Sequence, residues 1–403
     1  MGPFRHVMDG YRVLDFTQFV AGSVAGRLLA EIGAEVIKVE IAPNGDGSRS
    51  HAVFKGNRSA FFVQHNRGKK SLCVDPKRPA GLEILKGLIA RSDVFIENFT
   101  PGVIGRMGLD YATVRAINPR VVMCSLSSFG QDGPLALKPG FDTSGAAYCG
   151  IIDMQGEPDG PPVGVGGAVG DTNAGVSAAA AIGFALLHRE RTGIGQYLDI
   201  SLLDAYFHCH DRSVHIYSGS KGAIVPRRSG NHTPFYCPAG IFKGKDHYLV
   251  ITAVTDGQWA GVCRAMGKPE LLNDSRYKTN EERAKNGVVE MVEQWLQTLP
   301  SDDEATRLLD EQHVPVSPVL SVAEAVNHPH LRQRGTVVTI QDPVYGTIDV
   351  PASPLRFAQF PDLELQAPML GEHNTEILLN YLGYSLGYIK ELETQGVIHQ
   401  ESR

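Results

Sequence analysis

One carboxylate is notable for its position in the sequence. Asp171 follows a long stretch rich in Gly and Pro and opens a run of small residues that continues to Gly183. A helix of Ala, Gly and Ser can approach neighbouring backbone closely, and its first turn offers free N–H groups to an anion. The Asp171 side chain can therefore cap that helix, or it can be a nucleophile held where an oxyanion is stabilised.

The residues around Asp171 weaken the capping interpretation and leave both roles open. Gly170 and Gly175 flank it, so a substrate or another backbone can come close. No His, Lys or second carboxylate lies within several residues, which leaves only a partner distant in sequence. A lone carboxylate needs no base, since at a pKa of about 3.9 it is already ionised at neutral pH. The chemistry that suits it is acyl transfer, with a mixed anhydride as the first intermediate.

Basic residues form a second group of interest. Lys77 and Arg106 follow two consecutive predicted strands, and Lys138 lies in the long loop. Ligands of open parallel sheets bind beyond the carboxyl ends of the strands. The group therefore predicts a phosphate-bearing ligand there, although each residue taken alone is typical of a solvated surface charge.

The elements that must position these residues alternate between strand and helix. Strands are predicted over 12–17, 34–40, 70–75, 93–98 and 121–128, with helices over 24–32, 79–91 and 111–118. This order predicts an α/β fold with a mostly parallel sheet and right-handed crossovers. Residues 130–170 are predicted to be loop, and long loops within compact domains are usually functional.

A chain of 403 residues is expected to form about two domains. We expect a large α/β domain over 1–217, a linker over 218–235, a small α+β domain over 236–325 and a return to the large domain over 326–403. In the small domain the pattern predicts a hairpin of 239–242 with 247–252, and helices over 258–266, 288–298 and 303–311. A last helix is expected over 374–382.

Composition excludes several classes of partner. Hydrophobic residues make up 42% and charged residues 20%, as in soluble globular proteins. The net charge of −6 gives no reason to expect nucleic acid or an anionic membrane. No membrane-spanning stretch and no secretion signal is evident, and the six cysteines form no C-x-x-C pair. We therefore expect a cytoplasmic protein with reduced thiols.

Familiar binding motifs are absent from the sequence. The stretch 164–170 does not match G-x-G-x-x-G, and there is no Walker A, H-E-x-x-H or G-x-S-x-G pattern. His208 and His210 are two residues apart, and such side chains do not face one another on a helix. No metal site is expected.

Short stretches along nearly the whole chain occur in the order known from one enzyme family. They are Val13-Leu14-Asp15-Phe16-Thr17, residues 29–40, Asn66-Arg67-Gly68-Lys69-Lys70-Ser71, Glu97-Asn98-Phe99, Pro101-Gly102, Arg106-Met107-Gly108, Gly170-Asp171, Gly193-Ile194-Gly195-Gln196 and Leu370-Gly371-Glu372-His373. On these residues the chain resembles the family III CoA-transferases, the group of formyl-CoA transferase, the carnitine CoA-transferase and α-methylacyl-CoA racemase.

The resemblance implies a Rossmann-like large domain, a smaller α+β domain and two subunits threaded through one another as interlocked rings. A homodimer is expected, with a paralogous second subunit as the alternative. The nucleophile of the family falls on Asp171. The CoA-contacting positions of the family fall on Val20, Ala21, Ile41, Val74, Asp75, Lys77, Asn98, Phe99, Thr100, Arg106 and Lys138. Coenzyme A and acyl-CoA are then substrates, and no tightly bound cofactor is expected.

The implied reaction moves CoA from an acyl-CoA donor, by family habit succinyl-CoA, to a free carboxylic acid. It passes through an aspartyl anhydride and an aspartyl-CoA thioester. The alternatives are an acyl-CoA racemase or isomerase, and a non-catalytic subunit that binds CoA.

Three departures from the family narrow the substrate. Val20 replaces the glutamine of formyl-CoA transferases, and residues 231–238 replace their glycine-rich loop, so formate and oxalate are not expected. Phe141 stands where racemases carry a histidine base, and phenylalanine cannot move a proton. The acceptor is expected to be a dicarboxylate or an aromatic acid. Several aromatic side chains either line an apolar pocket or pack in the core, namely Phe19, Phe141, Tyr148, Phe235 and Tyr236.

Overall fold

The computed structural model describes residues 6–363 and 365–401 and divides the chain into two compact units. The large unit runs to Ile151, takes up the chain again over Val165–Asp211 and resumes at Arg332. The small unit comprises Ile152–Gly164 and Arg212–Leu331. The chain therefore leaves the large unit twice and returns to it twice.

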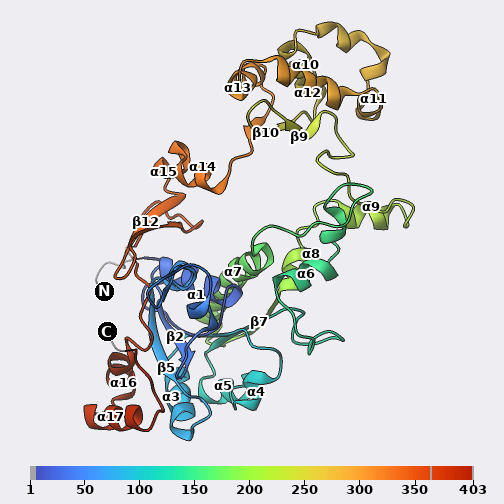
Figure 1. Ribbon diagram of the computed structural model, residues 1–403. Helices are drawn as coiled ribbons and strands as arrows, with labels where there is room; N and C mark the ends of the chain where they lie inside the picture. Colours follow the sequence, from blue (N-terminus) through green and yellow to red (C-terminus); the bar gives the residue numbers. More distant parts are fainter. Residues whose placement is uncertain (1–5, 364, 402–403) are drawn as a thin grey trace. The chain divides into compact units, whose positions relative to one another are not determined.

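A six-stranded sheet is the centre of the large unit (Figure 1). Its strands are β1 (Arg12–Phe16), β2 (Glu35–Ile41), β5 (Lys69–Val74), β6 (Val94–Glu97), β7 (Val122–Ser127) and β8 (Tyr197–Ser201). They lie in the order β5-β2-β1-β6-β7-β8, and every neighbouring pair is parallel. Strands β1, β2, β5, β6 and β7 are buried along nearly their whole length, whereas the edge strand β8 is partly exposed. The predicted α/β fold is confirmed.

Helices cover both faces of this sheet. The helices of the large unit are α1 (Ala21–Glu31), α2 (Ala60–Asn66), α3 (Pro79–Ile89), α4 (Val103–Arg106), α5 (Tyr111–Ile117), α6 (Asp142–Tyr148), α7 (Val169–Thr192), α8 (Leu202–Phe207), α16 (Asn374–Leu382) and α17 (Leu386–Thr394). One core joins the sheet to α3, α5, α16 and α17, and a second core joins its other face to α1, α7 and α8. Two short hairpins complete the unit, β3 (Phe54–Lys55) with β4 (Arg58–Ser59) and β12 (Val337–Asp342) with β13 (Gly346–Pro351).

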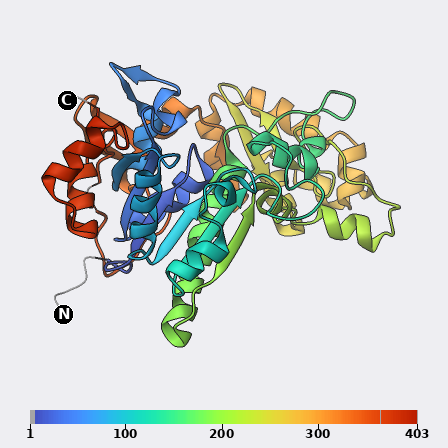
Figure 2. The ribbon, with the colours of Figure 1, turned by 90° about the horizontal axis from the view of Figure 1, so that it is seen from below.

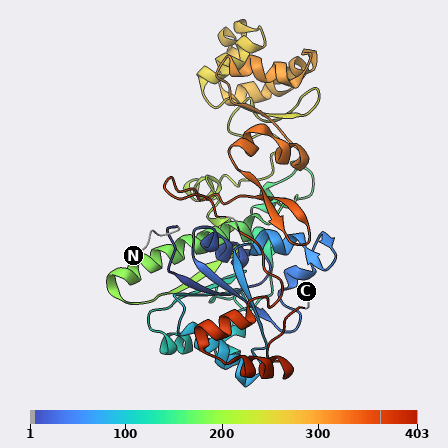
Figure 3. The same ribbon diagram turned by 90° about the vertical axis from the view of Figure 1, so that its left-hand side faces the viewer.

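Helices α1 and α7 pack against each other at very short range, because small residues meet at the contact. A Cβ added at Gly175 of α7 would lie 2.6 Å from the carbonyl oxygen of Ala21 in α1. It would also lie 2.7 Å from the Cβ atom of Val24. Figure 3 shows the two helices, dark blue and green, on the same side of the sheet. The run of small residues after Asp171 therefore serves this contact.

The C-terminal segment returns to the first half of the large unit. Helix α16 packs on α3, and Figure 2 shows the red C-terminal helices beside the blue N-terminal part. Residue Ile398 pairs with Val74 at the edge strand β5, and the N–H of Asp75 donates to the carbonyl of Val397 at 2.8 Å. The chain end thus covers the edge of the sheet where β5 finishes.

The small unit has its own core around Phe242, Trp259 and Leu296. Its antiparallel sheet has the order β11-β10-β9. The elements are α9 (Ser213–Gly219), β9 (Ala239–Lys243), β10 (Tyr248–Thr252), α10 (Asp256–Ala265), α11 (Asn280–Lys285), α12 (Val288–Thr298), α13 (Asp302–Asp310), β11 (Val316–Pro318) and α14 (Val322–Asn327). Helix α15 (Pro329–Gln333) crosses the boundary to the large unit. The predicted hairpin and its three helices are present.

Several expectations need correction. The stretch 130–170, expected to be loop, contains helix α6, and α17 follows the helix that was expected to be the last. Helix α1 begins at Ala21, three residues before the predicted start. Among the described residues, no helix combines the length and the apolar character that a bilayer crossing requires.

Candidate active site

Asp171 does not cap its helix. Helix α7 begins at Val169 and its N-cap residue is Ala168, which makes no side-chain cap bond. Asp171 is the third residue of the first turn, so the expectation that it opens the helix is wrong by two positions. Its carboxylate makes no hydrogen bond or ion pair with another described residue. A partly buried carboxylate without a protein partner is available to a ligand.

The capping role belongs to a second carboxylate, Asp142 at the start of α6. Its Oδ1 accepts the N–H of Asp171 at 2.8 Å, and its Oδ2 accepts the hydroxyl of Tyr206 at 2.7 Å. Asp142 is buried, and the ring of Tyr206 in α8 lies so close to Gly170 that a Cβ there would be 2.0 Å from it. A cap from a neighbouring helix satisfies the helix terminus in the same way as a local one.

This arrangement changes the acidity of Asp171. Burial, followed by the charge of Asp142, raises the pKa of Asp171 to about 7. The expectation that Asp171 is fully ionised at neutral pH is therefore wrong, because its setting disfavours the charge. Burial and the Asp142 carboxylate also raise the pKa of Tyr206, so the phenol keeps its proton and donates it to Asp142.

The segment that leads from β1 into α1 is held from two sides. Asn98, which follows β6, accepts the N–H of Gln18 at 2.7 Å and donates its amide to the carbonyl of Gln18 at 2.8 Å. Asp46 accepts the N–H of Phe19 at 3.2 Å, and Phe19 has the left-handed φ of 58°. These bonds fix the chain direction at Val20, the N-cap residue of α1.

Asp46, which accepts the N–H of Phe19, is itself held by a buried ion pair with Lys38. The Lys38 ammonium lies 2.7 Å from Asp46 Oδ2 and donates to the carbonyl of Thr17 at 2.9 Å. Burial alone would lower the pKa of Lys38, but the Asp46 and Asp15 carboxylates raise it above its ordinary value. The lysine is therefore charged, and its loss would leave buried carboxylates without a partner.

The residues expected to contact CoA follow the carboxyl ends of neighbouring strands. Ile41 and Val74 are opposite residues at the ends of β2 and β5. Asp75 follows Val74 and accepts the N–H of Lys77 at 3.0 Å. Asn98, Phe99 and Thr100 follow β6 directly, and Phe99 packs edge-to-face on Phe16 with centroids 5.0 Å apart. The structure thus gathers these positions at one edge of the sheet, and the assignment to CoA stays a prediction.

Two of these positions, Val20 and Ala21, pack against α7. Ala21 contacts Gly175, which is one helical turn after Asp171 and shares its face of α7. The side of the first turn that carries the Asp171 carboxylate therefore faces the start of α1. Lys77, Arg106 and Lys138 are all exposed, and the Lys138 ammonium donates to the hydroxyl of Tyr148 at 2.8 Å.

Other expected features have simple outcomes. The aromatic residues Phe19, Phe141, Tyr148 and Phe235 are between 39% and 74% exposed, so they are not core residues. All six cysteines are free, and Cys209 alone of the six is exposed. Among the described residues, no group of three or more His, Cys, Asp or Glu side chains is arranged to hold a metal ion.

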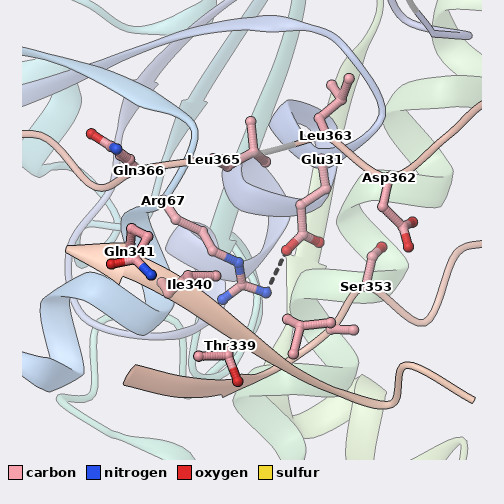
Figure 4. Close-up of a pocket in the computed structure, with 12 residues that line it drawn as sticks. Glu31, Arg67, Thr339, Ile340, Gln341, Ser353, Asp362, Leu363, Leu365 and Gln366 are labelled. Carbon is pink, nitrogen blue, oxygen red and sulfur yellow. Dashed lines mark hydrogen bonds and ion pairs between the residues drawn. The ribbon is translucent and has the colours of Figure 1, made fainter. Parts of the chain in front are cut away.

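A cavity of about 540 Å³ lies elsewhere in the large unit (Figure 4). The buried ion pair of Arg67 with Glu31 forms part of its wall, and β12 contributes Thr339 and Ile340. None of the expected site residues lines it. The cavity is therefore separate from the candidate active site.

Sequence reasoning missed Asp142 and Tyr206. They come from two other helices, 29 residues before and 35 residues after Asp171 in the numbering of the chain. The sequence carried a weak signal for Asp142, since it follows Gly140-Phe141 in the loop region and is acidic. No signal identified Tyr206, because its position depends on a close contact with Gly170, which has no Cβ atom, and the sequence does not show that contact.

Solved structures share this architecture over nearly its whole length. The chain superposes with a TM-score of 0.83 on a CaiB/BaiF family protein from Brucella suis, which is 32% identical. The match covers 94% of this chain and all of that one. The parallel sheet, the smaller antiparallel sheet and their order define a CaiB/BaiF-type α/β protein.

The sequence profile of CoA-transferase family III matches residues 8–374. The chain belongs to this family and is a family III CoA-transferase. Succinyl-CoA:glutarate CoA-transferase of Mus musculus is 36% identical over 400 residues, 98% of this chain and 90% of that protein. Acetyl-CoA:oxalate CoA-transferase of Acetobacter aceti is 34% identical over 93% of this chain and 95% of its own length. Several relatives that are 32–36% identical are named for succinyl-CoA.

Proposed function

We propose that the protein transfers CoA from succinyl-CoA to a free dicarboxylic acid of about the size of glutarate, with Asp171 as nucleophile. The observation that carries the proposal is the carboxylate of Asp171, which stands in the first turn of α7 without a protein partner. A structural cap would be bonded to the helix, and that bond is made by Asp142 instead.

The proposed reaction uses two covalent intermediates. The ionised Asp171 carboxylate attacks the thioester carbonyl of the donor, and the C–S bond breaks to release CoA thiolate and leave an aspartyl anhydride. The thiolate then attacks the aspartyl carbonyl, which gives an aspartyl-CoA thioester and the free donor acid. The acceptor carboxylate repeats both steps in reverse order, and no external oxidant, base or metal is consumed.

Each tetrahedral intermediate carries an oxyanion that needs hydrogen-bond donors. The N–H of Asp171 is taken by Asp142 and that of Thr172 by the carbonyl of Ala168, so the donors must be other backbone N–H groups near the carboxylate. One well-placed donor is commonly worth about 3 kcal/mol in the transition state. Val20 and Ala21, at the start of α1 beside α7, offer the acyl group an uncharged wall.

The choice of acids rests on the relatives. Their names pair succinyl-CoA or succinate with glutarate in proteins 33–36% identical to this one. Relatives named for oxalate are 33–34% identical, so the exclusion of formate and oxalate rests on the expected departures at Val20 and at residues 231–238. Phe141, 74% exposed, cannot replace the histidine base of a racemase. We therefore place succinyl-CoA as donor and a dicarboxylate as acceptor.

The assay that tests the function is an acceptor screen. Succinyl-CoA and acetyl-CoA are each incubated with the protein and a set of dicarboxylic, monocarboxylic and aromatic acids, and new thioesters are read by mass spectrometry. We expect glutaryl-CoA or a closely related thioester to form with succinyl-CoA, and no exchange of the α-proton with deuterated solvent. Transfer that occurs only with monocarboxylic or aromatic acids would contradict the proposed acceptor.

The nucleophile is tested separately. We expect Asp171→Ala to lower turnover by at least about 10⁴-fold while CoA binding by calorimetry stays within a few-fold, because the covalent route is removed and the CoA positions are untouched. Hydroxylamine added during turnover should convert Asp171 to its hydroxamate, detectable in the peptide mass. Asp132→Asn, an exposed acid in the loop after β7, is the matched control and should keep full activity.

A further inference from the structure

We propose that Asp142 and Tyr206 are positioning residues that hold the first turn of α7 and keep the Asp171 carboxylate free for the substrate. The proposal rests on the proposed function, since it presumes that Asp171 reacts. It assigns different roles to two carboxylates: Asp142 caps helix α7, and Asp171 reacts with the substrate.

The geometry shows how the two residues act on Asp171. Asp142 grips the main chain of Asp171 through one oxygen, at 2.8 Å, and the hydroxyl of Tyr206 through the other, at 2.7 Å. Both oxygens are thereby used, and the Asp142 side chain has one orientation. Tyr206 in turn lies on Gly170, the residue before Asp171. Three helices, α6, α7 and α8, therefore meet around the N–H of Asp171.

The arrangement keeps Asp171 from a competing role. A carboxylate at the third helical position normally bends back toward the free N–H groups of the helix terminus. Here Asp142 supplies the cap from outside, so the Asp171 side chain has no such bond to lose before it attacks a thioester. A reacting group that is positioned through its backbone keeps its side-chain lone pairs available.

The charge of Asp142 has a second effect. The groups that face Asp171 are Asp142 from α6 and the protonated Tyr206 from α8, whereas α1 presents uncharged Val20 and Ala21. Burial and then Asp142 raise the pKa of Asp171 to about 7. Higher basicity makes a carboxylate the stronger nucleophile once it is ionised. Glu97, whose pKa burial raises to about 7, lies on β6 and is untouched by changes at position 142.

The experiment compares kcat/KM against pH for the parent protein, Asp142→Asn, Asp142→Ala and Tyr206→Phe. In the parent we expect an acid limb with a midpoint near pH 7. Asn keeps an oxygen for the N–H of Asp171 but removes the charge, so its midpoint should fall by about 0.5–1 unit with kcat within about 5-fold. Asp142→Ala also removes the hydrogen bond to the N–H of Asp171. Its kcat should therefore fall by about 10- to 100-fold, with KM for succinyl-CoA within about 3-fold of the parent.

Tyr206→Phe isolates the hydroxyl. It should lower kcat by about 3- to 10-fold and leave the midpoint within about 0.3 unit, because the Asp142 charge remains. Asp302→Asn is the matched control. Asp302 is likewise a buried acid at the start of a helix, and its oxygens accept the N–H groups of Lys245, Asp246 and His247. It should leave the pH profile unchanged, whatever it does to stability.

Carbon-13 NMR titration of labelled aspartate in the whole protein measures the pKa of Asp171 without any turnover, with Asp171→Asn used for assignment. An unchanged Asp171 pKa in Asp142→Asn, or an Asp142→Ala variant as active as the parent, would overturn the positioning role. If Asp171→Ala kept its activity, Asp171 would not be the nucleophile, and the proposed function would be contradicted rather than the role of Asp142. The titration would still decide whether Asp142 controls Asp171.

Discussion

At the scale of single residues, the candidate site depends on two aspartates with different duties. Asp142 is bonded through both oxygens, whereas the Asp171 carboxylate has no protein partner and sits where its charge is disfavoured. A group held in an unfavourable state costs stability, and sites built for reactivity commonly carry such costs. Asp171 is therefore expected to destabilise the folded protein at the pH where it works.

The size and sign of that effect can be stated. The folded-state pKa of about 7 lies above the unfolded value of about 3.9, so between these values the native state binds the proton more tightly. Stability contributed by the protonated group is present below pH 4 and is lost as pH rises through 7. Asp171→Asn removes this loss. We expect the free energy of unfolding of Asp171→Asn to exceed that of the parent by about 2 kcal/mol at pH 8, after allowance for partial exposure of the side chain. Near pH 4 the two values should be equal.

Thermal melts of the two proteins at several pH values measure this difference. A melting temperature of Asp171→Asn equal to that of the parent at pH 8 would show that the carboxylate is not strained by its setting. Asp132→Asn serves again as the control, since that side chain is exposed and should shift neither curve.

At the scale of elements, the contact of α1 with α7 sets the distance between Val20 and Asp171. Gly175 permits this contact, because any side chain there would meet the backbone of Ala21 and the Cβ atom of Val24. Backbone cannot move aside as a flexible side chain can, so the helices would have to separate. The geometry of the candidate site is therefore coupled to one glycine.

Gly175→Ala tests this coupling. We expect a loss of about 1–3 kcal/mol in stability and a fall in kcat of about 10-fold or more, since a shift of α1 displaces the wall beside Asp171. Gly257→Ala in α10 of the small unit is the control, because a Cβ at Gly257 meets no heavy atom closer than 3.9 Å. It should raise stability by up to about 1 kcal/mol and leave kcat unchanged. If the two variants had the same kcat, the contact between α1 and α7 would have no effect on catalysis, and the prediction would be wrong.

The sequence predicted the sheet well and the site only in part, for physical reasons that differ. Each strand is a short β-rich run, so its signal is local. The order of the strands was not predicted, because it depends on pairing between segments far apart in the sequence. The start of α7 was missed because Val169 and Gly170 carry no capping signal. The acidity of Asp171 was missed because it arises from burial and from Asp142, and neither is local. Helix α17 was missed because its residues, Leu386–Thr394, are mostly polar or exposed.

At the scale of the whole molecule, the large unit is assembled from three separate stretches of chain with the small unit between them. A chain that leaves a unit and returns to it can close a ring, as the proposed interlocked homodimer requires. The long helix α7 also exposes Phe184 at 73% and Leu187 at 50%, which are large apolar side chains on its open face. Such exposure is typical of a surface that a partner covers.

The assembly is tested by mass and by exchange. We expect light scattering to give twice the chain mass of 43.6 kDa. Dimers carrying two different labels should not exchange subunits over days when mixed in the folded state, because threaded rings cannot part without unfolding. They should exchange freely after denaturation and refolding. A monomer, or exchange within hours, would contradict the threaded arrangement. Mixing with a monomeric control protein sets the background.

The pairing of Val397–His399 with the end of β5 has a consequence for how the protein is made. Val74 and Asp75 leave the ribosome early, yet the hydrogen bonds that complete their strand come from residues synthesised after the entire small unit. A nascent chain can form most of the sheet, but it lacks the hydrogen bonds at the end of β5 until these residues are available. If the expected CoA contacts at Val74 and Asp75 are made, that part of the site is completed only when residues 397–399 have left the ribosome.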